Sequence, residues 1–216
     1  MDRSEIQQAV QQIAEAERVR FCPDMTAGPE PEPAADDGRM AQFNSGRVIE
    51  CLFKNQVGDA ELYRELFRGK YLYDFAAGIW MVFTGHYWEQ DKCHAHMTAM
   101  QDVVSIYKVE CDRLSWRINV AQARSVPDAE MNRLTAQEKA VRARMPALQA
   151  KARIKDVLEL TRAGPDGLGT DGEQWDKNLL ILSCKNGVLE LDSGHFRPGK
   201  PDDILQVASN CGFLKS

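Results

Sequence analysis

The chain of 216 residues lacks the patterns that mark several common functions. No apolar run reaches the roughly 20 residues that cross a bilayer, and no signal-peptide pattern opens the chain. No GxxxxGK motif followed by Ser or Thr is present: residues 164–170 hold glycines without the lysine, and Gly199-Lys200 precedes a proline. No GxSxG turn marks a nucleophile. We therefore expect neither a membrane segment nor a nucleotide-hydrolysing site in this chain.

Paired cysteines are also missing. The cysteines are widely scattered along the chain, and no two of them form a CxxC pair. This pattern favours reduced thiols in a cytoplasm over a disulfide framework. The six cysteines are Cys22, Cys51, Cys93, Cys111, Cys184 and Cys211.

Negative charge is scarce in the middle of the chain, although the formal net charge is -5. Residues 104–155 carry eleven Lys or Arg against five acidic residues, a local excess of +6. Residues 1–50 show the opposite balance, with five basic and ten acidic residues. The negative net charge of the whole chain argues weakly against nucleic acid as a partner, whereas the basic middle segment argues weakly for it.

The order of composition and periodicity predicts three parts. Residues 1–21 form an N-terminal helix with a thin apolar stripe. Residues 22–42 are rich in proline and acidic side chains, which predicts a linker without a core. Residues 43–216 form the ordered domain, into which a helical hairpin is inserted at 92–163. The fold class that we expect is α+β.

The stretch of residues 58–91 is the richest in aromatic side chains. It predicts a helix capped by Asp59, followed by three short strands with alternating apolar positions. Gly85-His86 has the length and the glycine placement of a two-residue hairpin turn. We expect Trp80 and Trp88 to hold this sheet, and a surface for stacking bases is the alternative.

The periodicity then becomes helical. Apolar residues within 100–118 alternate spacings of four and three, which is the seam of a helix that packs along another helix. A second helix follows, with Leu134, Val141 and Leu148 seven residues apart. Pro146 either kinks this helix or begins a third one. We therefore expect a helical hairpin with a broken second arm.

The last quarter of the chain predicts a second hairpin. The apolar run at residues 179–182 fits a buried strand, and Asn186-Gly187 is a strong hairpin signal. A short helix is expected at residues 201–209. The two hairpin regions would together form one small antiparallel sheet that packs on the helical hairpin.

Two small groups of residues have the right chemistry for a metal or a catalytic site. Glu190 and Asp192 stand two apart on a predicted strand, like the paired carboxylates that hold two magnesium ions, but no third carboxylate can be located. The other group does not show the two spaced pairs that are typical of zinc sites, so we expect no metal. It consists of Cys93, His94 and His96, with His86 and Cys111 as possible additions.

The basic middle segment supplies the candidates for DNA binding. Arg113, Arg117 and Arg124 share a helical face at spacings of four and seven. Phosphate contacts need clustered positive charge and little geometry, so we expect weak, non-specific DNA binding here; a solvated face is the alternative. The full set is Arg113, Arg117, Arg124, Arg142, Arg144, Lys151, Arg153 and Lys155.

Two separated blocks of the sequence resemble one family. The first block is Gly58-Asp59 before the Ala60-Glu61-Leu62 helix, then Tyr71-x-Tyr73-Asp74, Gly78-x-Trp80 and Gly85-His86-x-Trp88. The second is Asn186-Gly187-Val188-Leu189-Glu190-Leu191, followed by Gly194, Pro198 and Pro201-Asp202-Asp203. In this order they resemble the domain just ahead of the ATPase module in phage and plasmid primase–helicases of superfamily 3, a group that includes poxvirus relatives.

The resemblance implies a non-catalytic module between a priming domain and a hexameric, ATP-driven DNA helicase. Such a module would help ring assembly or guide DNA. The resemblance also implies a homo-oligomer in the full-length protein, an origin in a phage or prophage, and a place in the bacterial cytoplasm. ATP and magnesium are expected only in a downstream ATPase domain, so no cofactor is expected in this chain.

The chain ends at Ser216 before any ATPase motif, so we expect a fragment or a degenerate prophage product. Two other functions stay open at this point. One is a protein–protein interaction domain that dimerises through its helical seam without binding DNA. The other is a small metal-dependent enzyme around Cys93 and His96.

Overall fold

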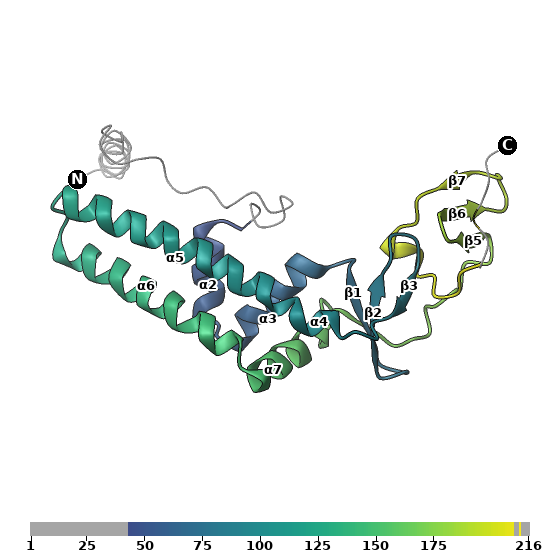
Figure 1. Cartoon of the computed structure of the whole chain (residues 1–216), viewed down its shortest axis with the longest axis horizontal. Helices are drawn as coiled ribbons and strands as arrows, with labels where there is room; N and C mark the ends of the chain where they lie inside the picture. Colours follow the sequence, from purple (N-terminus) through teal and green to yellow (C-terminus); the bar gives the residue numbers. More distant parts are fainter. Residues whose placement is uncertain (1–42, 210–211, 213–216) are drawn as a thin grey trace, which may run out of the picture.

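The structure is a computed structural model that describes residues 43–209 and 212. The predicted N-terminal helix at 1–21 and the predicted linker at 22–42 lie outside these residues. The described part is elongated, with the long helices at one end and two small sheets toward the other (Figure 1). The α+β class predicted from the sequence is confirmed.

The helices are α2 (Ser45–Phe53), α3 (Gln56–Phe67), α4 (Ala95–Thr98), α5 (Met100–Ala123), α6 (Asp128–Leu148) and α7 (Lys151–Arg162), with one 3₁₀ turn, η2 (Pro201–Asp203). The strands are β1 (Tyr71–Asp74), β2 (Ile79–Phe83), β3 (Trp88–Gln90), β4 (Gly169–Thr170), β5 (Ile181–Cys184), β6 (Gly187–Glu190) and β7 (Phe196–Arg197).

The strands form two sheets. The first has the order β3-β2-β1-β4 and the second the order β5-β6-β7. In the first sheet β4 runs parallel to β1, with Tyr73 opposite Gly169 and Asp74 opposite Thr170. The prediction of one antiparallel sheet is therefore wrong in two respects, because the hairpins lie in separate sheets and one edge is parallel. A strand of two residues shows no periodicity that would have revealed it.

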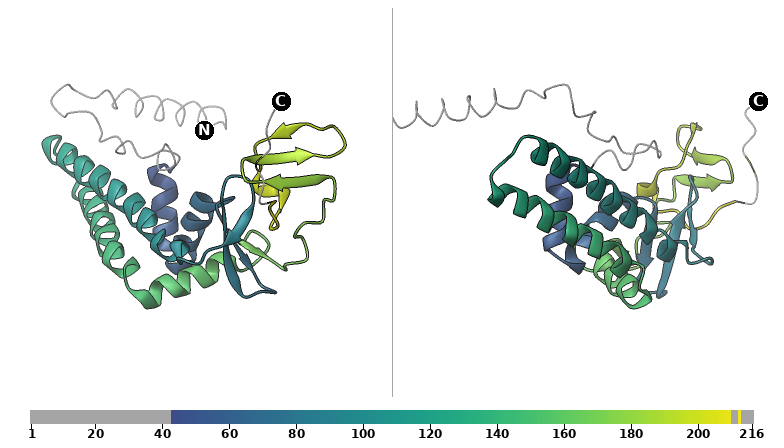
Figure 2. Two further views of the ribbon diagram at one scale, coloured as in Figure 1. Left: turned by 45° about the vertical axis from the view of Figure 1, so that its right-hand side comes forward. Right: turned by 60° about the vertical axis from the view of Figure 1, so that its left-hand side comes forward.

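The helical hairpin is confirmed. Helices α5 and α6 lie side by side and run in opposite directions, and α7 leads back toward the first sheet (Figure 2). Leu134, Val141 and Leu148 of α6 are buried, as their spacing predicts. The seam of α5 is also buried inside this chain at Met100, Val104, Tyr107, Cys111 and Leu114, with Ile118 partly buried.

The break in the second arm lies after Pro146 rather than at it. Pro146 occupies the last turn of α6, and the helix continues to Leu148. The N–H groups of Gln149 and Ala150 then donate to carbonyls three residues back, which tightens the end of the helix. Helix α7 begins only at Lys151, so Pro146 is not its first-turn residue.

Both predicted hairpins form, the first with a longer loop and the second with a shifted turn. The loop between β2 and β3 has four residues, 84–87, because the last strand pair is Phe83 opposite Trp88. Gly85-His86 lies at its centre, enclosed by a hydrogen bond from the N–H of Thr84 to the Tyr87 carbonyl at 2.9 Å, and Gly85 has a φ of 106°. In the second hairpin Cys184 pairs with Gly187, so the loop is Lys185-Asn186 rather than Asn186-Gly187. Gly187 lies within β6, where a Cβ atom would overlap the ring of Phe196.

Two predictions for the C-terminal part are wrong. The expected buried strand at residues 179–182 begins two residues later, and Leu179 is 84% exposed. An apolar run without alternation does not fix where a strand starts. The expected helix at 201–209 is only the 3₁₀ turn η2, because Ile204 adopts a φ of 50°. The extended chain then accepts a hydrogen bond at the Leu205 carbonyl from the N–H of Trp88, at 2.7 Å.

The two blocks that carry the family resemblance meet in space. The indole N–H of Trp88 donates to the Pro201 carbonyl at 2.9 Å, and Trp88 is buried. The N–H of Gly199 donates to Nδ1 of His86 at 3.2 Å. A Cβ atom on Gly199 would overlap the backbone of His86, so this close approach requires glycine.

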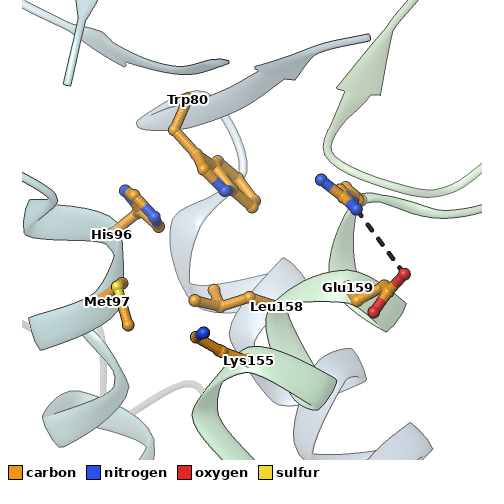
Figure 3. A pocket seen from close by; sticks show the side chains of 7 residues that line it. Trp80, His96, Met97, Lys155, Leu158 and Glu159 are labelled. Atoms are coloured by element: carbon orange, nitrogen blue, oxygen red, sulfur yellow. Dashed lines mark ion pairs between the residues drawn. The ribbon is translucent and has the colours of Figure 1, made fainter. Parts of the chain in front are cut away.

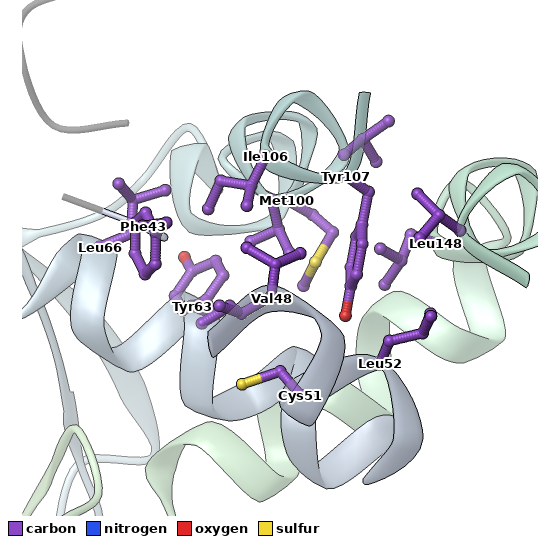
Figure 4. Close-up of a cluster of buried hydrophobic side chains, with 14 of the residues drawn as sticks. Phe43, Val48, Cys51, Leu52, Tyr63, Leu66, Met100, Ile106, Tyr107 and Leu148 are labelled. Carbon is purple, nitrogen blue, oxygen red and sulfur yellow. The ribbon is translucent and has the colours of Figure 1, made fainter. Parts of the chain in front are cut away.

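Apolar side chains from α2, α3, α5 and α6 converge in the helical part (Figure 4). Helices α2 and α3 approach so closely that a Cβ atom on Gly58 would overlap the backbone of Cys51. The two largest of the fully buried side chains there are Tyr63 and Tyr107. Gly58 therefore sets how closely α2 packs on α3, and with it the shape of this core.

A buried carboxylate joins α3 to the other long helices. Asp59 was expected to cap its helix, but α3 begins three residues earlier and encloses Asp59 completely. Its Oδ2 atom contacts Arg144 of α6 at 2.8 Å and Arg153 of α7 at 2.6 Å. Its Oδ1 atom accepts a hydrogen bond from the hydroxyl of Tyr107 on α5 at 2.8 Å. Burial, and then the charge of Asp59, raise the pKa of Tyr107 well above its ordinary value.

We expect Asp59→Ala to lower the free energy of unfolding by about 3–5 kcal/mol, because it leaves two arginines without their buried partner. Chemical unfolding followed by circular dichroism measures the loss. Glu50→Ala is the matched control, since Glu50 forms exposed ion pairs on α2, and it should destabilise the protein far less than Asp59→Ala does. Equal losses in the two variants would show that the buried carboxylate does not hold the helices together.

Candidate nucleic-acid interface

Two of the predicted DNA-binding arginines are directed into the protein. Besides contacting Asp59, Arg144 donates to the Leu52 carbonyl at 3.0 Å, and Arg153 donates to Oδ1 of Asn55 at 2.8 Å. Their side chains are mostly buried. These two arginines therefore do not belong to an outer basic surface, because each is fixed at the junction of α2 and α3.

Two more of the predicted residues attach the start of α2 to α5. Arg113 donates to the Phe43 carbonyl at 3.2 Å, and Arg117 donates to the hydroxyl of Ser45 at 3.0 Å. That hydroxyl donates in turn to the buried carboxylate of Glu110. Arg113 and Arg117 are half-buried, so these two candidates are also engaged within the fold.

The other four predicted residues are exposed, but they do not form one surface. Arg142 forms an ion pair with Glu138 on its own helix. Within the described part of the chain, no ion pair involves Arg124, Lys151 or Lys155. Arg124 follows α5, whereas the lysines follow α6, whose 21 residues span about 32 Å. The end of α5, which Arg124 follows, therefore lies at the opposite end of the hairpin from the end of α6, which the lysines follow.

Helix α7 carries a basic stripe that the sequence analysis found only in part. Lys151, Lys155 and Arg162 are spaced by four and seven residues, so they share one face of the helix. We call these three residues the α7 basic stripe. The guanidinium of Arg162 lies 4.2 Å from the ring centroid of Tyr73 and 3.7 Å from a carboxylate oxygen of Glu159. The spacing of seven from Lys155 is the signal that would have identified Arg162.

A pocket of about 230 Å³ opens between β2, α4 and α7 (Figure 3). Two members of the α7 basic stripe, Lys155 and Arg162, line it together with Trp80 and Leu158. Trp80 is only half-buried, and its ring stacks on that of His96 with centroids 4.8 Å apart and planes 18° apart. Trp80 therefore contributes to the sheet and also to this pocket.

The ring of His96 is fixed from behind by a buried carboxylate. Nδ1 of His96 lies 2.7 Å from Oδ2 of Asp91, and Asp91 also accepts the backbone N–H groups of Ala95 and His96 at 2.9 Å. Burial lowers the pKa of His96, and the neighbouring Asp91 opposes this effect without cancelling it. Burial alone would raise the pKa of Asp91, but the hydrogen bonds from His96 and Ala95 outweigh it and lower that pKa.

The cysteine and histidine cluster shows no arrangement for a metal. His96 is buried against Asp91, whereas Cys93 and His94 are exposed. Among the residues that the structure describes, no three His, Cys, Asp or Glu side chains are placed to hold a metal ion. A second hollow of about 630 Å³ lies along β3, and its charged lining is Glu89, Asp91 and Lys92. Its excess of negative charge makes it the less suitable of the two for a nucleic acid.

The carboxylate pair predicted on a strand does not form. Glu190 ends β6 and accepts a hydrogen bond from Nε of Arg197 at 2.7 Å, which lowers the pKa of Glu190. Arg197 also forms a two-pronged contact with Asp203, both distances being 2.8 Å. Asp192 lies beyond the strand in a turn. Glu190 therefore links β6, β7 and η2 instead of facing Asp192 across a metal site.

The two sequence blocks that meet in space are the ones that resemble an N-terminal module of primase–helicases. A family model described as "D5 N terminal like" matches residues 60–215. The chain therefore belongs to this family, the N-terminal domain of D5-like phage and viral primase–helicases, and the predicted resemblance is confirmed. No curated protein matches the chain. None of the helices within the described residues is long and apolar enough to span a membrane.

The contact between Asp91 and His96 predicts a pH dependence of stability. Because the pKa of His96 is lower in the folded state, the unfolded state takes up the proton more readily, and stability falls as the pH drops below about 6.5. The lowered pKa of Asp91 adds to the loss at more acidic pH. Urea unfolding measures the free energy of unfolding at about pH 8 and at about pH 5.5. The decrease between these two pH values should be smaller for His96→Gln than for the parent. The control variant His195→Gln, at an exposed histidine, should show the same decrease as the parent. An equal decrease in the parent and in both variants would refute the role of His96.

Proposed function

We propose that this domain is a non-catalytic, DNA-binding module of a replication primase–helicase, and that the α7 basic stripe contacts the phosphate backbone. The observation that supports this surface is the exposure of Lys151 and Lys155 beside Arg162 on one helical face. Arg144 and Arg153, by contrast, already neutralise Asp59. Phosphate contacts are favoured where positive charge is accessible, as it is at Lys151 and Lys155, whereas Arg162 shares its charge with Glu159 at 3.7 Å.

The proposed binding is weak and independent of sequence. Three cations offer at most a few phosphate contacts, which corresponds to roughly 10⁻⁴–10⁻⁶ M at physiological salt. Membership of the family is consistent with assembly of the full-length protein into a homo-oligomer, and assembly would multiply these contacts. Tight binding would then depend on the assembled state rather than on the single domain.

Dimerisation through the helical seam is the less supported alternative. Met100, Tyr107 and Leu114 of the seam are buried within this chain. They pack against the other helices of the same core, so a partner helix would have to displace existing contacts. A metal-dependent reaction around Cys93 and His96 has no supporting arrangement among the described residues.

We expect Lys151→Gln combined with Lys155→Gln to weaken DNA binding and to flatten its dependence on salt. For a single strand, each lost phosphate contact lowers the slope of log affinity against log salt by about 0.7, so the double variant should lose about 1.4. Fluorescence anisotropy with labelled single-stranded and double-stranded oligonucleotides, across a range of salt concentrations, measures both quantities.

Arg124→Gln is the matched control, because Arg124 is also exposed but lies at the other end of the hairpin. It should keep the affinity and the salt slope of the parent. The reverse pattern, with loss in the Arg124 variant and none in the lysine variant, would place DNA on the tip of the hairpin. Unchanged binding in both variants would remove this surface from the interface.

A further inference from the structure

The pocket between β2, α4 and α7 has the composition of a site for a flat aromatic group. Its lining includes the indole of Trp80, with the apolar side chains of Met97 and Leu158. Figure 3 shows Trp80 above Leu158, with His96 at the side of the space between them. The volume of about 230 Å³ is below the roughly 300–1,000 Å³ of pockets that enclose drug-sized ligands. It suits one heteroaromatic ring better than a complete cofactor.

The ring of Trp80 is held in place before any ligand arrives. His96 stacks against it, and Asp91 fixes the His96 ring from behind at 2.7 Å. Tyr73 contacts the indole from another side, with centroids 5.4 Å apart and planes at 65°. A rigid aromatic surface of this kind binds a ring without first losing conformational freedom.

The charges around the pocket favour a ring that carries phosphate. Lys155 and Arg162 line it and belong to the α7 basic stripe. Glu159 supplies the one acidic side chain in the lining and lies 3.7 Å from Arg162, the ion pair drawn in Figure 3. Its carboxylate can still accept a hydrogen bond from the amino or imino group of a base, because each oxygen accepts more than one. The lining therefore combines a stacking surface, two cations and one acceptor, which are the elements used to bind single-stranded nucleic acids.

We propose that this pocket takes one base of a single-stranded nucleic acid, which stacks on Trp80 while its flanking phosphates contact Lys155 and Arg162. This inference rests on the proposed function, since the α7 basic stripe has to hold the backbone beside the pocket. A duplex would first have to release a base from its own stack, which costs a few kcal/mol. The pocket therefore gives the domain a preference for single strands, in addition to the non-specific attraction of its charges.

The test compares two single strands of equal length and charge on the unmodified protein. One is an oligothymidine of about twelve nucleotides, and the other is the same backbone with abasic sites throughout. A stacked base contributes enough to make the oligothymidine bind roughly 5- to 150-fold more tightly. Trp80→Leu should remove this ratio and keep the affinity for the abasic strand, whereas Trp80→Phe should keep part of the ratio. Thermal melting shows whether each variant is folded.

The outcomes separate this inference from the proposed function. If the parent protein binds neither strand, both fail. If it binds the two strands equally, the α7 basic stripe still holds the backbone but no base enters the pocket, and the inference is overturned. This comparison needs no variant, so it stands even if Trp80→Leu does not fold. A folded Trp80→Leu variant that keeps the full ratio would place the base elsewhere and would also overturn the inference.

Discussion

The buried carboxylate of Asp59 is the interaction on which the rest of the structure depends. It receives Tyr107 from α5, Arg144 from α6 and Arg153 from α7, so one side chain of α3 fixes three helices. A carboxylate removed from water is tolerated only when opposite charges and hydrogen bonds compensate for its lost hydration. Arg144 and Arg153 therefore serve to compensate the charge of Asp59 inside the protein. Lys151 and Lys155 of α7 stay exposed at the surface, beside the pocket that Trp80 lines.

The sequence blocks that identify the family act mainly in packing. Gly58 lets α2 and α3 pack closely, and Gly199 lets its own backbone approach the backbone of His86. Trp88 joins the first sheet to Pro201 through its indole N–H. The proposed contacts to nucleic acid lie largely between the two blocks, on α7, where no motif marks them. The motifs therefore identify the domain, whereas the surface on α7 supports the proposal for its function.

The sequence predicted those parts of the fold that depend on neighbouring residues. The seam of α5 follows from spacings of three and four, and the position of the first hairpin, though not its loop length, follows from the conformation that Gly85 allows. It did not predict contacts set by tertiary packing. Asp59 and Arg153 are 94 residues apart, and no local pattern shows that one neutralises the other. Residues 104–155 do carry an excess of basic side chains. The number of charges, however, does not show which arginines form ion pairs inside the fold.

Photo-cross-linking to a single strand tests most directly whether nucleic acid meets this domain at α7 and Trp80. An oligonucleotide that carries 5-iododeoxyuridine at one position would be irradiated with the protein, and mass spectrometry would identify the attached peptide. Attachment at Trp80 or at its neighbour His96 is the expected result, because both rings line the pocket beside Lys155 and Arg162. Attachment confined to the tip of the hairpin near Arg124, or to the exposed leucines around Leu179, would contradict it.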